Sequence, residues 1–171
     1  STVNVTFGMD VKFDANGILY CTIGNERGHI ALAGLPNFVN VASKVFKSSD
    51  ASLGSFTNIT PVSSVFADLN YGRIELGISP SNPNVVYASI ANKNTSLPGS
   101  TQVPNSASWR GIFVSYNGGT SWALLKQGSA SLDPLSSNGV ISSGDYAHVL
   151  LVNPSNPNQL YIGSYSFYLF N

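Results

Sequence analysis

The chain of 171 residues carries eight Lys or Arg and eight Asp or Glu, so its formal net charge is zero. Proteins that bind nucleic acids need a basic surface to displace counterions, so the sequence predicts no nucleic-acid partner. It contains no run of about 18 apolar residues, which predicts no membrane-spanning helix. Charged residues make up only 9% of the chain, whereas aromatic residues reach 11%. This composition favours a folded, turn-rich β protein and is typical of an extracellular or cell-surface location.

The first predicted elements are two strands joined by a short polar turn, within residues 11–20 (Val-Lys-Phe-Asp-Ala-Asn-Gly-Ile-Leu-Tyr). A third strand is predicted at residues 45–48, and a fourth begins at Phe56 in the run Phe-Thr-Asn-Ile. Each run is short, rich in β-branched and aromatic residues, and bounded by Gly, Pro, Asn or Ser, as strands are. The single cysteine, Cys21, excludes an internal disulfide and is expected to be a small buried hydrophobe.

The same order of elements returns further along the chain. Residues 78–87 read Ile-Ser-Pro-Ser-Asn-Pro-Asn-Val-Val-Tyr, and residues 152–161 read Val-Asn-Pro-Ser-Asn-Pro-Asn-Gln-Leu-Tyr. Such self-similarity indicates a structural repeat of about 70 residues. Three tyrosines recur at one position of the repeat, which predicts that they pack in the core: Tyr20, Tyr87 and Tyr161.

Four strands are predicted in the second unit, at residues 73–79, 85–90, 111–115 and 122–125. Four antiparallel strands per repeat make one blade of a β-propeller. We therefore expect an all-β fold, a β-propeller fragment of about two to two and a half four-stranded antiparallel blades. The predicted repeats lie approximately at 8–60, 73–127 and 147–171, and the last is incomplete. A closed propeller needs about four blades or more, so the remaining blades are expected from the same chain or from other copies.

Residues 115–122, Ser-Tyr-Asn-Gly-Gly-Thr-Ser-Trp, resemble the Asp-box of BNR-repeat propellers, Ser/Thr-x-Asp-x-Gly-x-Thr/Ser-Trp/Phe, with Asn117 in place of the usual Asp. Residues 48–56 resemble it more loosely, with one inserted residue. The Pro-Ser-Asn-Pro-Asn block is similar to the first hairpin of sortilin-like and xyloglucanase-like propellers, as in large secreted proteins of Bacteroidota that use the type IX route. This resemblance implies a secreted β-propeller but no particular activity.

The Asp-box residue types suit a tight turn between the third and fourth strands of a blade. The hydroxyl and the Asp or Asn side chain bond the amides of the turn, and glycine supplies a positive φ. The final aromatic ring is expected to be buried between sheets. We therefore expect structural roles for seven residues: Ser48, Asp50, Phe56, Ser115, Asn117, Gly119 and Trp122.

Candidate ligand-binding residues lie in the long predicted loops, residues 22–44, 57–72, 88–110 and 126–147, or at their edges. These loops share one face of a propeller, and function concentrates in such loops. All three arginines are among them, and an arginine cluster would suit a carboxylate ligand, as in sialidases. The Trp-Arg pair at residues 109–110 would suit stacking against a sugar. The candidates are Glu26, Arg27, His29, Arg73, Trp109, Arg110, Asp145 and His148.

Two functional hypotheses remain open at this stage. The first is a binding, adhesion or structural scaffold module of a secreted or cell-surface protein, with a glycan or protein ligand. The alternative is part of a xyloglucanase-like or sialidase-like glycoside hydrolase whose cleft lies on the long-loop face. No motif pairs two carboxylates at the spacing such enzymes need, so catalytic residues are unassigned and enzymatic activity stays uncertain. The sequence predicts no cofactor and no metal site, since its two histidines stand alone.

Overall fold

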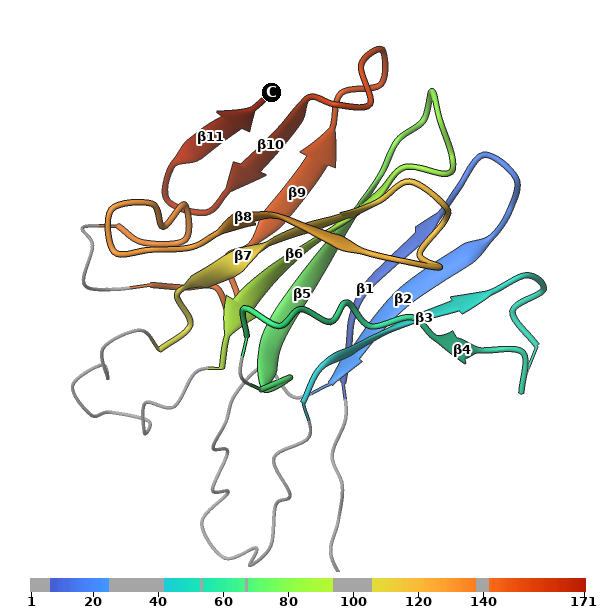
Figure 1. Cartoon of the computed structure of the whole chain (residues 1–171), viewed down its shortest axis with the longest axis horizontal. Coiled ribbons are helices and arrows are strands. Elements are labelled where there is room, and N and C mark those ends of the chain that lie inside the picture. Colours follow the sequence, from blue (N-terminus) through green and yellow to red (C-terminus); the bar gives the residue numbers. More distant parts are fainter. Residues whose placement is uncertain (1–6, 25–41, 53, 67, 94–105, 138–141) are drawn as a thin grey trace, which may run out of the picture.

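The computed structural model describes residues 7–24, 42–52, 54–66, 68–93, 106–137 and 142–171. Within these ranges the chain forms strands and turns, and it has no helix that could cross a membrane. The strands build three antiparallel sheets that stand side by side (Figure 1). The predicted all-β propeller architecture is therefore confirmed.

Each sheet is a meander in which consecutive strands pair. Blade 1 contains β1 (Phe7–Phe13), β2 (Leu19–Gly24), β3 (Lys44–Ser48) and β4 (Thr57–Asn58). Blade 2 contains β5 (Tyr71–Ile78), β6 (Val86–Asn92), β7 (Trp109–Ser115) and β8 (Ala123–Gln127). Blade 3 contains β9 (Val149–Val152), β10 (Leu160–Gly163) and β11 (Phe167–Phe170). The first strands, β1, β5 and β9, lie next to one another from blade to blade.

Blade 2 lies between the other two and is buried on both faces. Along β6, Val86, Ala88 and Ile90 pack toward blade 1, whereas Tyr87 and Ala91 pack toward blade 3. This follows from the two-residue period of a strand, which sends successive side chains to opposite faces. A continuous apolar run in the sequence is therefore the expected pattern for a strand between two sheets.

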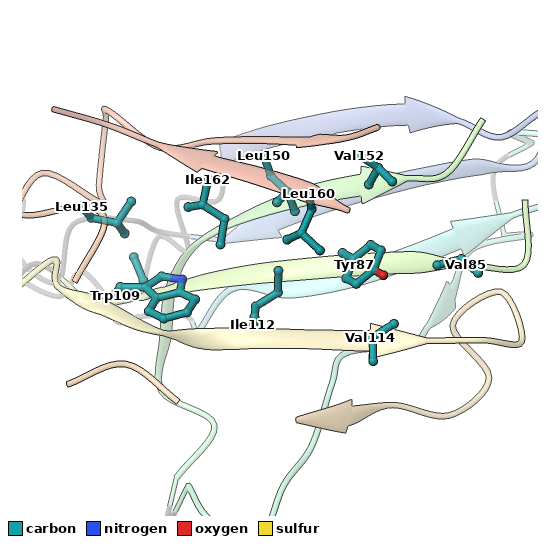
Figure 2. Packing of buried hydrophobic residues seen from close by; sticks show 11 residues of the cluster. Val85, Tyr87, Trp109, Ile112, Val114, Leu135, Leu150, Val152, Leu160 and Ile162 are labelled. Carbon is teal, nitrogen blue, oxygen red and sulfur yellow. The ribbon is translucent and has the colours of Figure 1, made fainter. Parts of the chain in front are cut away.

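Two hydrophobic cores hold the blades together. The core between blades 1 and 2 contains Tyr20, Val45, Tyr71, Ile74, Leu76, Val86, Ala88, Ile90 and Phe113. The core between blades 2 and 3, shown in part in Figure 2, contains Val85, Tyr87, Ala91, Trp109, Ile112, Val114, Leu135, Leu150, Val152, Leu160 and Ile162. Each large side chain buried here stabilises the fold by about 1.5–3 kcal/mol.

The three repeated tyrosines do not share one environment, although they share one position. Tyr20 and Tyr87 are buried, and their hydroxyls donate to carbonyls of the following blade, Gly118 at 3.4 Å and Pro157 at 2.7 Å. Tyr161 is exposed, so the prediction that it packs in the core is wrong for the structure described. The cause is that no sheet among the described residues covers this face of blade 3.

The turn between β7 and β8 is held by its own side chains. The Ser115 hydroxyl accepts the N–H of Gly119 at 2.8 Å, and the Asn117 side-chain oxygen accepts the N–H of Ser121 at 2.9 Å. Gly119 has a φ of +85°, which glycine adopts without strain. Trp122 packs at the edge of the core between blades 1 and 2 and donates its indole N–H to the Ile59 carbonyl at 2.7 Å. These residues shape the turn and join two blades.

The corresponding turn of blade 1 is similar at its start and different at its end. Ser48 accepts the N–H of Ala51 at 2.8 Å, and Asp50 lies in the turn at the surface. Phe56 is exposed, so the expectation that its ring is buried between sheets is wrong. After the inserted residue the fourth strand is only two residues long, and Ile59 packs at the interface instead.

Candidate functional site

The two ends of the sheets differ. We call the end with the β1–β2, β5–β6 and β7–β8 turns the turn face. We call the opposite end, with the connections between blades and the β10–β11 hairpin, the loop face (Figure 1). Three of the predicted ligand-binding residues, Glu26, Arg27 and His29, lie outside the described residues. The other five belong to elements that begin or end at the loop face.

Arg110 ties the connection between blades 1 and 2 to the start of β7. Its Nη2 donates to the backbone carbonyl and to Oδ1 of Asp68, each at 2.9 Å. Its guanidinium lies 4.7 Å from the ring centroid of Phe66 and 5.1 Å from that of Tyr71, so it also makes cation–π contacts. The arginine side chain is mostly covered, with 13% exposure, so these contacts leave little of it for a ligand. A ligand-binding role for Arg110 stays a prediction.

Trp109 and His148 meet through a buried serine. Trp109 donates its indole N–H to Ser89 Oγ at 2.9 Å, and the same oxygen lies 2.8 Å from His148 Nε2. Because Oγ already accepts the indole proton, its own hydrogen is available to His148 Nε2. Burial, and secondarily the charge of Arg73, lower the pKa of His148 from 6.5 to about 3. The imidazole is therefore neutral at physiological pH.

The indole of Trp109 is buried with this histidine, and its ring centroid lies 5.7 Å from that of Phe170 in blade 3. Figure 2 shows the ring within the core between blades 2 and 3. Little of it is therefore available to stack against a sugar, and that role stays a prediction.

An ionic network joins β1 and β5, the first strands of blades 1 and 2. Arg73 Nε lies 2.6 Å from Glu75 Oε1, and Lys12 Nζ lies 3.0 Å from Asp10 Oδ1. The second oxygen of Asp10 accepts the backbone N–H of Leu76 at 2.9 Å, which links the strands. Burial, followed by the charge of Asp10, raises the pKa of Glu75 from 4.5 to about 7, although Arg73 opposes the shift. Glu75 is thus a carboxyl group that titrates near neutral pH.

We expect the substitution Glu75→Gln to change the pH dependence of stability. In the native state Glu75 binds its proton more tightly than in the unfolded state, so its contribution is complete below pH 4.5 and is lost as the pH rises through 7. The variant cannot ionise. Its free energy of unfolding relative to the parent should therefore increase by about 3 kcal/mol between pH 4 and pH 8. Urea denaturation at each pH measures this difference.

Asp68→Asn is the matched control for this prediction. The pKa of Asp68 is lowered from 3.8, chiefly by the backbone N–H of Asn70, so its contribution is lost only as the pH falls below that value. The relative stability of this variant should therefore stay nearly constant between pH 4 and pH 8 and change in the opposite direction only below pH 4. The side chain is 62% exposed, and the change should be small. Equal pH profiles for the parent and Glu75→Gln would contradict the assignment of a raised pKa to Glu75.

Two exposed tyrosines on the loop face share a serine, and neither was singled out by the sequence. Ser143 Oγ lies 2.9 Å from the Tyr146 hydroxyl and 3.1 Å from that of Tyr165, and the two hydroxyls lie 3.2 Å apart. Tyr146 precedes β9, whereas Tyr165 lies in the β10–β11 hairpin. Their exposures are 60% and 55%, so both rings offer apolar surface beside polar hydroxyls. We call this group the tyrosine platform.

The structure brings some candidates together and separates others. Trp109 and His148 share Ser89, and the charge of Arg73 acts on the same histidine. Asp145, which is buried, lies next to the tyrosine platform in sequence. Arg110 is held by Asp68 and Arg73 by Glu75, so the two arginines among the described residues pair with separate carboxylates, while Arg27 lies outside them. The described residues also include no group of three His, Cys, Asp or Glu that could hold a metal.

Comparison with known proteins gives the fold a context. No family profile and no curated protein matches the sequence. The structure is similar to the GH74 xyloglucanase from Xanthomonas campestris, with a TM-score of 0.58 at 18% identity, and to the GH74 enzyme from Niastella koreensis, with a TM-score of 0.55 at 23% identity. Each alignment covers 96% of this chain but only 20% and 22% of the respective enzymes. The chain thus has the fold of β-propeller blades and spans about a fifth of the length of these structures.

Proposed function

We propose that this chain is a segment of a secreted or cell-surface Asp-box propeller that binds a glycan on its loop face. The observation that carries the proposal is the tyrosine platform, where Ser143 holds two exposed aromatic rings. A tyrosine ring offers an apolar face to the C–H groups of a sugar, and its hydroxyl offers a hydrogen bond at the ring edge. The low content of charged residues is consistent with a neutral ligand.

The hydrogen bonds of the platform favour binding because they order the rings in advance. An exposed side chain normally loses about 0.5–1.5 kcal/mol of rotamer entropy when it is immobilised at an interface. Ser143 already restrains Tyr146 and Tyr165, and tyrosine has few rotatable bonds, so less freedom is lost on binding. We therefore expect the platform to bind a glycan with useful affinity, although the contact surface is small.

We expect Tyr146→Ala and Tyr165→Ala each to weaken glycan binding by about tenfold, as the loss of an aromatic contact of about 1.4 kcal/mol would do. Affinity electrophoresis and calorimetric titration of the 171-residue chain with soluble xyloglucan and other neutral β-glucans measure this effect. Tyr165→Phe keeps the ring and removes the hydroxyl, and it should lie between the parent and the alanine variant.

Tyr116→Ala is the matched control, because Tyr116 is equally exposed but lies in the β7–β8 turn on the opposite face. It should bind as the parent does. The proposed binding surface would be contradicted if none of the glycans bound the parent chain. It would also be contradicted if Tyr116→Ala lost as much glycan affinity as the platform variants.

A second candidate function is one wall of a glycoside hydrolase cleft. The similarity to a GH74 xyloglucanase favours this alternative. Glycoside hydrolysis generally needs two carboxyl groups about 5–10 Å apart, and the platform would then hold the substrate while acidic residues elsewhere in the ring act on it. Release of reducing ends from xyloglucan by the source-purified native protein distinguishes the two, since the 171-residue segment need not carry the acidic residues itself. Binding by that protein without release supports a binding module, and release supports the hydrolase.

A further inference from the structure

A pocket lies between blades 1 and 2, at the outer edge of the turn face. Its walls are the end of β3, the strand β4 with the residues that follow it, and the β7–β8 turn. Its volume is about 740 Å³, within the range of about 300–1,000 Å³ that small ligands occupy in proteins. Both blades that form the pocket contain all four of their strands, so its walls come from complete sheets.

The wall of this pocket combines hydroxyl groups, apolar surface and one positive charge. The hydroxyls belong to serines and threonines of both blades, and the apolar surface belongs to Ile59, Val62 and Trp122. Lys47 is the one charged residue among the described residues that line the pocket. A few polar groups beside apolar surface are what a saccharide needs, because its rings carry hydroxyls at their edges and C–H groups on their faces.

Lys47 stands where the next blade has a buried apolar residue. Lys47 pairs with Tyr20 between β3 and β2, and Val114 pairs with Tyr87 between β7 and β6, so the two residues are equivalent in the repeat. Val114 is 2% exposed in the core between blades 2 and 3, whereas Lys47 is half-buried and lines the pocket. Lysine is rarely used to fill a packing position, so the charge at this place calls for another role.

The ammonium group of Lys47 is placed by the protein but is not neutralised by it. Its Nζ donates to the Gly118 carbonyl at 2.9 Å and lies 5.6 Å from the ring centroid of Tyr20. An ammonium group has three protons to donate, and no carboxylate of the described residues pairs with this one. Asp14 and Asp50, in nearby turns, accept backbone N–H groups of their own turns instead.

Gly118 also keeps space open beside this charge. A Cβ at that position would lie 3.1 Å from Lys47 Nζ and 3.2 Å from the Tyr20 hydroxyl. The pocket thus contains a half-buried cation, without a carboxylate partner in the part of the chain described, next to hydroxyl groups and an indole ring.

We infer that this pocket binds an acidic saccharide and that Lys47 pairs with the carboxylate of a uronic acid unit. A half-buried ammonium attracts a carboxylate more strongly than an exposed one, because less water screens the pair. The hydroxyls of the wall bond to the sugar hydroxyls, and Val62 and Trp122 contact its C–H groups. The pocket lies on the face opposite the tyrosine platform, so the two sites take different glycans, one acidic and one neutral.

Calorimetric titration of the 171-residue chain with short oligogalacturonates tests the inference. Reduction of the carboxyl groups of the same oligosaccharides to alcohols should weaken binding at least about tenfold, and so should a rise to high salt concentration. Polyglutamate carries the same charge without sugar rings and should also bind at least about tenfold more weakly. The inference would be overturned if oligogalacturonates did not bind, or if either comparison ligand bound equally well.

A change of one exposed residue tests the role of the charge without disturbing the core. Thr57 on β4 is exposed and pairs directly with Lys47 on β3. Thr57→Glu places a carboxylate opposite the ammonium and should weaken oligogalacturonate binding at least about tenfold, because the lysine then has a partner within the protein. Thr57→Gln has nearly the same shape without the charge and should bind within about twofold of the parent. Equal binding by the two variants would overturn the inference.

Lys47→Met removes the ammonium group and keeps most of the stem, and it should lose at least about tenfold in affinity for oligogalacturonate. Lys44→Met, at an exposed lysine of the same strand outside the pocket, is the matched control and should bind as the parent does. Circular dichroism confirms that each variant is folded. An equal loss in both lysine variants would contradict the assigned site.

The two glycan sites can be tested separately. Tyr146→Ala should leave oligogalacturonate binding unchanged, and Lys47→Met should leave the binding of neutral β-glucans unchanged. A loss of both activities in Lys47→Met would show that this substitution disturbs the fold of the blades, and the pocket would then be contradicted unless Thr57→Glu alone lost the acidic ligand.

Discussion

Phe113→Ala is expected to lower the free energy of unfolding by about 3–5 kcal/mol. Phe113 is fully buried on β7, in the core between blades 1 and 2, and its ring lies edge-on to that of Phe66 at 5.7 Å between centroids. Truncation removes apolar contacts and leaves a cavity between two sheets, which the strands on both sides hold open. Urea denaturation followed by tryptophan fluorescence, at one fixed protein concentration, measures the loss.

Two further variants separate the loss of packing from a general response to mutation. Phe113→Leu retains most of the apolar contact and should cost less than Phe113→Ala. Tyr116→Ala, at an exposed residue three positions along the chain, should change the free energy of unfolding by less than about 0.5 kcal/mol. A loss below about 1 kcal/mol for Phe113→Ala would contradict the description of this interface as a packed core.

The fold could be predicted because its repeat is local in sequence. A strand, a turn and a strand with a closing tyrosine recur three times, and the turn residues and strand pattern that mark each unit are adjacent in sequence. The exposure of Tyr161 and Phe56 could not be predicted in the same way. Whether a ring is buried depends on the neighbouring sheet that covers it, and in the case of Phe56 on a fourth strand that is only two residues long.

The candidate site was harder to predict because its contacts join distant parts of the chain. Sequence patterns indicate loops, but they do not show that His148, just before β9, reaches Ser89 on β6 of the neighbouring blade. The tyrosine platform was missed because its rings lie in short polar loops without a motif. The one sequence signal for the platform is the presence of aromatic residues, Tyr146 and Tyr165, in turns where polar side chains usually face the solvent.

His148→Gln is expected to reduce the sensitivity of the fold to acid. The pKa of His148 is lowered in the native state, from 6.5 to about 3, so the folded protein binds fewer protons than the unfolded one between these values. The contribution of the neutral histidine is therefore complete above pH 6.5 and is lost as the pH falls toward 3. For the parent this loss amounts to as much as about 4 kcal/mol, whereas glutamine cannot take up a proton and should lose none of it.

The difference between the two unfolding profiles isolates the histidine from the other titrating groups. Carboxylates with lowered pKa values, such as Asp68, destabilise the parent and the variant equally in acid. Glu75 has the opposite sign and acts mainly between pH 4.5 and 7. Loss of packing around the substituted side chain would shift the variant profile by the same amount at every pH, whereas removal of the buried imidazole changes its slope below pH 6.5. Parallel profiles would therefore show that His148 takes up a proton as easily in the native state as in the unfolded state. That result would contradict the burial of the Trp109–Ser89–His148 group.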